Sequence, residues 1–217
     1  EIGSRKSEYI DQSIFWTMRK KDIELLLQNL DFLEDSNNLL EQYRTPASIA
    51  ADLLHIAYMQ GDISNKVVAD LGCGNGIFAI GAAILGAKKV YALDIDPRQL
   101  KIAEKNARNL NLGIEYINKD VKDFDIESDT ILENPPFGSQ TRNANIPFLE
   151  KIKYGKISYI LYHKKSIEFV YAKIKELGYF IDFQKSYSFE LPYQFSFHKK
   201  AKKYIEVILL RVKGEFT

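Results

Sequence analysis

Four polar residues of this chain have the type and the placement to act on a ligand, because each lies where an apolar segment ends. Asp70, Asp94 and Asp120 close three successive segments, and Asn134 follows a fourth. Asp70 also leads into the glycine-rich residues 72–76 (GCGNG). Carboxylates bind ammonium groups and ribose diols, and glycines let a backbone turn tightly against a ligand. These residues therefore indicate a binding site at the ends of the apolar segments.

The residue after the glycines separates two kinds of cofactor. A dinucleotide-binding loop needs a third glycine where this chain has Ile77, so a pyrophosphate is disfavoured. S-adenosylmethionine instead carries an ammonium, a diol, an adenine amine and a sulfonium, which suit three successive acids. A glycine loop or a single acid also occurs for packing or helix capping, so the prediction depends on the whole set. The predicted cofactor-binding residues are Asp70, Gly72, Gly74, Asp94, Ile95, Asp120, Val121 and Asn134.

Residues 134–137 (NPPF) form a second motif. Each proline keeps the residue before it out of the helical region, so the segment is extended and stiff. The side-chain oxygen of Asn134 and the carbonyl of Pro135 can then accept one hydrogen each from an amino group, which turns the nitrogen lone pair towards a methyl donor. Phe137 is placed to stack on a flipped base. The predicted catalytic residues are Asn134, Pro135, Pro136 and Phe137.

Strands and helices alternate along the middle of the chain. Short apolar runs predict strands at residues 66–71, 89–94, 114–118, 130–133 and 157–162. Helices are predicted after the glycines, after the capping pair Asp96 and Pro97, and at residues 166–177. Strands at 179–189 and 204–212 have no helix between them, so they are expected to pair antiparallel.

The amino-terminal part reads as helical. Residues 15–38 show helical spacing of leucines, and Thr45 is predicted to cap a second helix with Pro46 at its first position. We therefore expect one domain, over residues 61–217, with a helical extension over residues 1–60 packed on it. The predicted class is an α/β fold: a Rossmann-like, mostly parallel sheet that ends in an antiparallel hairpin.

Charge is unevenly distributed along a chain whose net charge is only +1. Residues 1–150 hold 16 Lys and Arg against 23 Asp and Glu, whereas residues 151–217 hold 14 against 6. A basic carboxyl-terminal third suggests contact with a polyanion, although a solvated lysine surface has the same composition. The single cysteine, Cys73, fits a cytoplasmic protein, and the longest apolar run, residues 77–87, is too short to cross a bilayer.

Taken together, the glycine loop, residues 94–97 (DIDP) and residues 134–137 resemble the class I methyltransferases that modify amino groups of bases. Further segments resemble one branch, the methyltransferase-like enzymes that methylate adenine N6 in small-subunit ribosomal RNA. These segments are residues 40–43 with Thr45, 65–70, 134–138, 162–164 and 197–200. The resemblance runs from about residue 40 to residue 212.

The resemblance implies several roles. Gln42 and Thr45 would close over the cofactor, and residues 139–146 would help to form the acceptor pocket. A small zinc-binding activator subunit is implied as a partner, and the edge strand at residues 114–118 could receive it by strand addition. The candidate RNA-binding residues, basic or aromatic, are Lys164, Phe197, His198, Lys199, Lys200, Lys202 and Lys203. His163 reads as structural, and no metal site is expected in this chain.

Three other functions remain open from the sequence. A protein glutamine N5-methyltransferase acting on a release factor uses a related motif, but usually with tyrosine at the place of Phe137. A DNA adenine methyltransferase would share the basic character of the carboxyl-terminal third. A scaffold that binds RNA without catalysis is disfavoured by the complete set Asp70, Asp94, Asp120 and Asn134.

Overall fold

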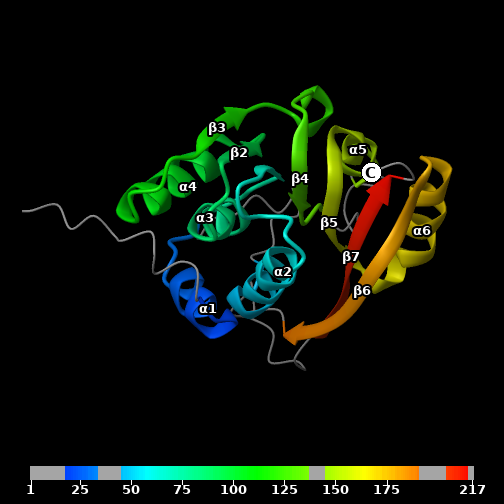
Figure 1. Cartoon of the computed structure of the whole chain (residues 1–217), viewed down its shortest axis with the longest axis horizontal. Coiled ribbons are helices and arrows are strands. Elements are labelled where there is room, and N and C mark those ends of the chain that lie inside the picture. The colour runs from blue at the N-terminus through cyan, green and yellow to red at the C-terminus, as the bar shows by residue number, and fades with distance from the viewer. Residues whose placement is uncertain (1–17, 34–44, 137–144, 191–203, 215–217) are drawn as a thin grey trace, which may run out of the picture.

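A single twisted sheet organises the computed structural model, which describes residues 18–33, 45–136, 145–190 and 204–214 (Figure 1). These residues form seven strands in the order β3-β2-β1-β4-β5-β7-β6. The parallel strands are β1 (Val67–Leu71), β2 (Lys89–Asp94), β3 (Glu115–Asn118), β4 (Ser128–Glu133) and β5 (Gly155–His163). At the other end, β7 (Tyr204–Gly214) pairs antiparallel with both β5 and β6 (Tyr179–Glu190). The predicted mostly parallel sheet with a terminal antiparallel hairpin is confirmed.

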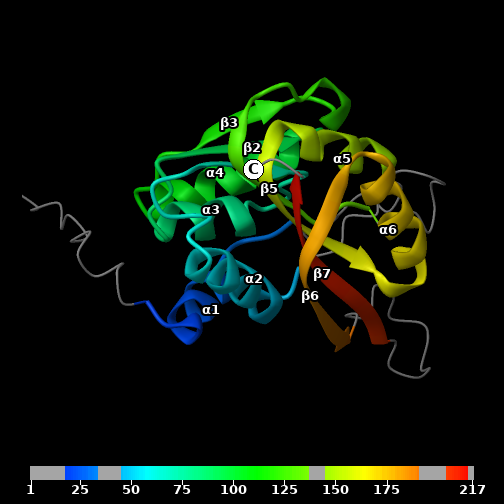
Figure 2. The same cartoon turned by 45° about the vertical axis from the view of Figure 1, so that its right-hand side comes forward.

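Helices cover both faces of this sheet (Figures 1 and 2). One large apolar cluster contains residues of α1 (Lys20–Gln28), α2 (Ala47–Met59), α3 (Ile77–Ile84) and α4 (Pro97–Asn109). A second cluster, beyond β4, contains residues of α5 (Ile146–Lys151) and α6 (Ile167–Glu176). The inner parallel strands are apolar almost throughout because both of their faces are buried. No helix within the described residues is long and apolar enough to span a membrane, and a cytoplasmic location stays a prediction.

Two predictions for the amino-terminal part are wrong. The helix expected over residues 15–38 ends at Gln28, and residues 30–33 are not helical. The Asn106 side chain there bonds both the N–H and the C=O of Asp31 at 2.9 and 3.0 Å, replacing helical bonds. Thr45 does not cap α2, whose N-cap position is Pro46. The caps at Asp96 and Pro97 are confirmed, since the Asp96 carboxylate accepts from the Arg98 N–H.

Short elements were not predicted. The described chain contains, besides the short helix α5, three 3-10 turns: η3 (Val121–Asp123), η4 (Ile152–Tyr154) and η5 (Lys164–Ser166). Each is too brief to produce a periodic apolar pattern, which is why sequence reasoning missed them. Two of them matter for the site, because η3 and η5 begin just beyond the carboxyl ends of β3 and β5.

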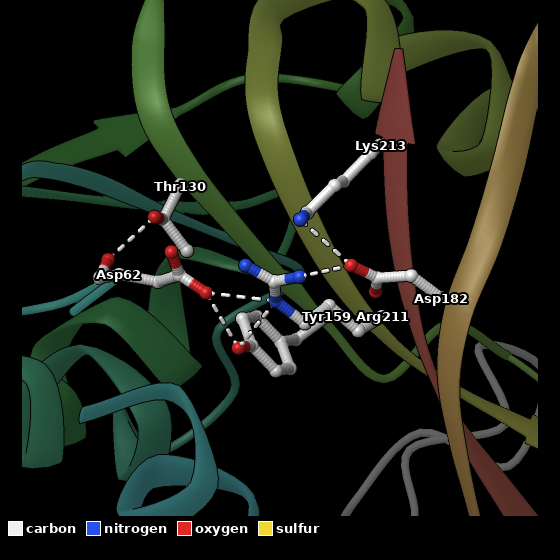
Figure 3. A network of polar contacts seen from close by, with 6 residues as sticks. All are labelled: Asp62, Thr130, Tyr159, Asp182, Arg211 and Lys213. Carbon is white, nitrogen blue, oxygen red and sulfur yellow. Dashed lines mark hydrogen bonds and ion pairs between the residues drawn. The ribbon is translucent and has the colours of Figure 1, made fainter. Parts of the chain in front are cut away.

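A buried polar network connects the loop before β1 to the carboxyl-terminal hairpin (Figure 3). The Asp62 carboxylate accepts from the Tyr159 hydroxyl at 2.6 Å and from Arg211 Nε at 2.9 Å. Arg211 also pairs with Asp182, which Lys213 reaches at 2.8 Å. Thr130 of β4 donates to the Asp62 carbonyl. The network thus joins β4, β5, β7 and β6 to one loop, away from the carboxyl ends of the parallel strands.

Candidate active site

The glycine-rich turn between β1 and α3 folds over the end of β2. Gly72 and Gly74 have φ values of +71° and +54°, which residues other than glycine rarely adopt. The N–H groups of Gly72 and Cys73 donate to the Leu93 carbonyl at 2.8 and 2.9 Å. A Cβ on Gly72 would also come within 3.1 Å of the Phe148 ring. The first two glycines are therefore required by backbone conformation, and the first also by packing.

Asp70 lies almost completely buried at the end of β1. Its Oδ2 accepts from the Ala79 N–H of α3 at 2.9 Å, and its Oδ1 has no hydrogen-bond partner. Burial, with a smaller effect from the nearby Asp94 charge, raises the pKa of Asp70 to about 8. A buried acceptor without a partner is costly, so a cationic ligand that supplied the missing hydrogen bond would stabilise the ionised carboxylate.

Asp94, at the end of β2, is bonded on both carboxylate oxygens. Oδ2 accepts from the Gly74 N–H at 2.8 Å, and Oδ1 accepts from the Asp96 N–H at 2.9 Å. Burial raises its pKa above the ordinary value, although these bonds oppose the shift. Asp94 therefore positions the glycine turn, and each oxygen keeps a lone pair for a ribose hydroxyl. The next residue, Ile95, is half exposed, which leaves an apolar surface beside the carboxylate.

The end of β3 is attached to the end of β2. The Asn118 side chain donates to the carbonyls of Asp94 and Ile95 at 3.0 and 3.1 Å. Asp120 then caps η3 by accepting from the Lys122 N–H at 2.9 Å, so its predicted ligand role competes with a capping role. Val121 is buried, in the apolar cluster that also contains Phe124 and Phe148.

Asn134 follows β4 and is held by a residue from far away in the sequence. Its Nδ2 donates to the Thr45 hydroxyl oxygen at 2.9 Å, whereas its Oδ1 is buried without a partner. Pro135 is buried and Pro136 is partly exposed. Thr45 therefore lies at the predicted catalytic motif, in contact with Asn134.

Glu133, just before Asn134, was not singled out from the sequence. It is completely buried, and neither carboxyl oxygen has a hydrogen-bond partner. Burial raises its pKa to about 8. The available signal was an acid ending an apolar run, residues 130–133 (TILE). In the described residues, the buried side-chain polar atoms without a partner belong to Asp70, Glu133 and Asn134, at the carboxyl ends of the neighbouring strands β1 and β4.

A cluster of three polar residues joins the glycine turn to the segment after α1. Asn106 of α4 donates to the carbonyls of Asp31 and Asn75 at 3.0 and 3.1 Å, and Asn75 donates to the Asp31 carbonyl at 3.1 Å. The sequence placed Asn75 in the glycine-rich loop, but it gave no signal for Asp31 or Asn106, because neither residue belongs to a motif. Asp31 thus lies against the glycine turn, two residues before the described segment ends.

Only some of the remaining predicted residues lie within the described part of the chain. Gln42, Phe137 and the aromatic–basic loop of Phe197, His198, Lys199, Lys200, Lys202 and Lys203 lie outside the described residues. Lys164 begins η5 at the end of β5 and forms a half-exposed ion pair with Glu206 at 2.9 Å. His163 accepts from the Lys165 N–H at 3.0 Å, a capping role consistent with the structural interpretation. The described residues contain no group of His, Cys, Asp or Glu that could hold a metal ion.

Comparisons with known proteins identify the family of this chain. The family model of ribosomal protein L11 methyltransferase (PrmA) matches residues 53–134. The Danio rerio protein named rRNA N(6)-adenosine-methyltransferase METTL5 is 33% identical over 203 residues, covering 89% of this chain and 98% of that protein. Its Drosophila melanogaster counterpart of the same name is 30% identical over 200 residues, with 88% and 94% covered. The crystal structure of a candidate RNA methyltransferase from Pyrococcus horikoshii is 34% identical with a TM-score of 0.84, and 91% of this chain and 98% of that chain are covered.

The sheet order, the glycine turn and the acids at the strand ends define a class I methyltransferase whose methyl donor is S-adenosylmethionine. Within that class, the chain belongs to the METTL5 family.

Proposed function

We propose that this protein transfers a methyl group from S-adenosylmethionine to the exocyclic N6 of an adenine in RNA, and that small-subunit ribosomal RNA is the substrate. The observation that carries the proposal is the free, buried Oδ1 of Asn134 at the end of β4. The relatives named for rRNA adenosine N6 methylation match this chain over most of its length and support the same acceptor.

The residues around the donor site fit its chemical groups. Asp70 Oδ1 is an unsatisfied acceptor suited to the ammonium, and Asp94 retains acceptor capacity for the ribose hydroxyls. Ile95 and Val121 provide apolar surface for the adenine ring, with Asp120 as acceptor for its amine. Gly72 and Gly74 allow the backbone to approach closely. Bound in this way, the cofactor supplies a methyl group on a positively charged sulfur.

Asn134 addresses the weak nucleophilicity of the acceptor. The lone pair of an adenine amine is delocalised into the ring, so the amine reacts poorly while it is planar. Asn134 Oδ1 accepts one amine hydrogen and the Pro135 carbonyl accepts the other, which favours a pyramidal nitrogen. The two prolines keep both acceptors in place. The rate therefore depends on alignment and preorganised dipoles.

RNA binding is assigned to the basic carboxyl-terminal third. Lys164 lies at the end of β5, next in the sheet to the strand that carries Asn134. The sequence of the loop that contains Phe197 and His198, which lies outside the described residues, adds stacking rings and cations. These groups suit the backbone and the unstacked bases of RNA.

A small zinc-binding activator subunit is the proposed protein partner. β3 is the edge strand expected to receive it. The Tyr116 and Ile117 side chains pack against the chain's own clusters, so the edge would offer backbone groups rather than apolar side chains. Full activity of the isolated chain as a stable monomer would count against this partner.

The function is tested with labelled donor, total RNA and the enzyme, with and without an activator subunit. Mass spectrometry of the digested nucleosides should show N6-methyladenosine. Asn134→Ala should keep donor affinity, measured by calorimetry, while transfer falls by at least about a hundredfold. If the label appears in protein glutamine, or only in DNA, the proposed RNA acceptor is wrong. If Asn134→Ala transfers the methyl group at the normal rate, the proposed role of Asn134 is wrong.

A further inference from the structure

We propose that Thr45 is a positioning residue that restrains the Asn134 carboxamide in the orientation seen in the structure. The hydrogen bond from Asn134 Nδ2 to Thr45 Oγ1, at 2.9 Å, joins two residues 89 positions apart. This inference rests on the proposed function, in which Asn134 Oδ1 accepts from the acceptor amine. It gives Thr45 a task different from the cofactor contact that the family resemblance implies.

Orientation matters because the two ends of a carboxamide have similar shapes and opposite roles. With Oδ1 towards the acceptor, Asn134 accepts a hydrogen from the amine. Rotated by half a turn, it would present its own NH₂ group to the amine, and two donors would face each other. The bond to Thr45 engages the NH₂ end, and Oδ1 is the atom left without a partner. A hydroxyl can donate as well as accept, so Thr45 does not select between the two orientations; its bond restrains the carboxamide in the observed one, which leaves Oδ1 open to the acceptor as the reaction requires.

Both partners are held by rigid elements. Pro46 restricts Thr45 to an extended backbone, and α2 begins one residue later with a largely buried surface. Thr45 itself is nearly buried. Asn134 follows β4, an inner strand paired on both sides by β1 and β5. Because α2 and β4 position the two backbones, the hydroxyl can restrict rotation of the carboxamide about its last side-chain bond.

The test compares Thr45→Val, which keeps the shape and removes the hydroxyl, with Thr45→Ser, which keeps the hydroxyl. Thr130→Val is the matched control, because it removes a buried hydroxyl from β4 whose bond goes to the Asp62 carbonyl, outside the site. For Thr45→Val we expect kcat to fall about tenfold to a hundredfold at saturating donor and RNA, as for a misaligned reacting group. Donor affinity should change little, and Thr45→Ser should recover most of kcat.

A second readout does not depend on catalysis. The side-chain NH₂ protons of Asn134 can be followed by NMR in each variant without RNA. They should shift and exchange faster with solvent in Thr45→Val, and remain as in the wild type in Thr45→Ser and Thr130→Val.

Two outcomes would overturn the proposal. One is a loss of donor affinity in Thr45→Val with kcat unchanged, which would make Thr45 a cofactor contact. The other is an unchanged Asn134 NH₂ signal in Thr45→Val. Failure of the proposed function is a separate result: the wild-type protein would then leave RNA adenine unmethylated, while the NMR comparison would still report on the bond.

Discussion

At the scale of single residues, Glu133 is a buried acid beside the proposed catalytic residue, and the proposed chemistry gives it no role. Its carboxyl is completely buried beside Asn134, and neither oxygen is hydrogen-bonded. Burial of an unpaired charge is costly, so the neutral form is favoured and the pKa rises to about 8 from an ordinary 4.5. Glu133 therefore makes the stability of the protein depend on pH.

The sign follows from where the proton resides. Between pH 4.5 and about 8 the folded protein keeps a proton on Glu133 that the unfolded chain has lost. The free energy of unfolding therefore falls as pH rises through this window, by at most about 1.4 kcal/mol per pH unit from this group. Below the window the group has no effect on the slope, because both states are protonated.

Glu133→Gln removes the ionisable group and keeps its size. We expect the variant to be close to the wild type in stability at pH 5 and more stable at pH 8, so that the difference between them grows with pH. Urea unfolding of both proteins from pH 5 to pH 9 measures this difference and cancels the contribution of Asp70, which they share. Parallel pH profiles for the two proteins would show that Glu133 is not held neutral by burial.

Residue types at the site could be predicted, but their pairings could not. Asp70, Asp94 and Asn134 were predictable because the carboxyl ends of parallel strands meet at one edge of a sheet. The bond between Thr45 and Asn134 joins residues 89 positions apart, and the isolation of Glu133 depends on what packs around it. Both depend on tertiary packing, for which local sequence contains no signal.

At the scale of elements, the parallel strands were the most predictable part. Their apolar runs are short and lie between turn residues, and the structure changes their bounds by a residue or two. The first helix was predicted too long, because the periodic leucines continue past Gln28 whereas Asn106 binds the backbone of Asp31. A side chain 75 positions away decided where that helix ends.

The network around Asp62 should be the main polar contribution to docking of the hairpin. Arg211→Met keeps the apolar length of the side chain and leaves the Asp62 carboxylate without its buried cation. Loss of one partner of a buried ion pair costs about 3–5 kcal/mol, so the free energy of unfolding should fall by that order. Urea unfolding at pH 7 provides the measurement.

The exposed ion pair between Arg108 and Glu104 provides a comparison for that variant. Arg108→Met should cost less than about 1 kcal/mol, because exposed pairs contribute little. If Arg211→Met is as stable as Arg108→Met, the Asp62 network does not hold the hairpin in the way that we infer.

At the scale of the whole molecule, the sheet has two different ends. β3, short and near the cofactor acids, closes one edge, and the long strand β6 closes the other. The uneven charge follows this direction, since residues 151–217 supply β5, β6 and β7 and hold 14 Lys and Arg against 6 Asp and Glu. The sequence alone shows that the carboxyl-terminal third is basic. That this basic part lies beside Asn134 follows only from the strand order, in which β5 is next to β4.

This arrangement predicts that RNA affinity depends on salt through lysines at the carboxyl ends of the strands. Lys164 and Lys165 are exposed at the end of β5, and the ion pair of Lys164 with Glu206 is too exposed to hold it strongly.

Each lysine that contacts a phosphate contributes about 0.7 to the magnitude of the slope of log affinity against log salt on single-stranded nucleic acid. In the double variant Lys164→Ala, Lys165→Ala, the magnitude of this slope should therefore decrease by about 1.4. The slope is measured by titrating the binding of a ribosomal RNA fragment from low to moderate salt. Lys88→Ala is the control, because Lys88 is also exposed but lies at the amino end of β2, where its loss should not change the slope. If the double variant keeps the wild-type slope, or if Lys88→Ala lowers it as much, RNA does not approach this end of the sheet.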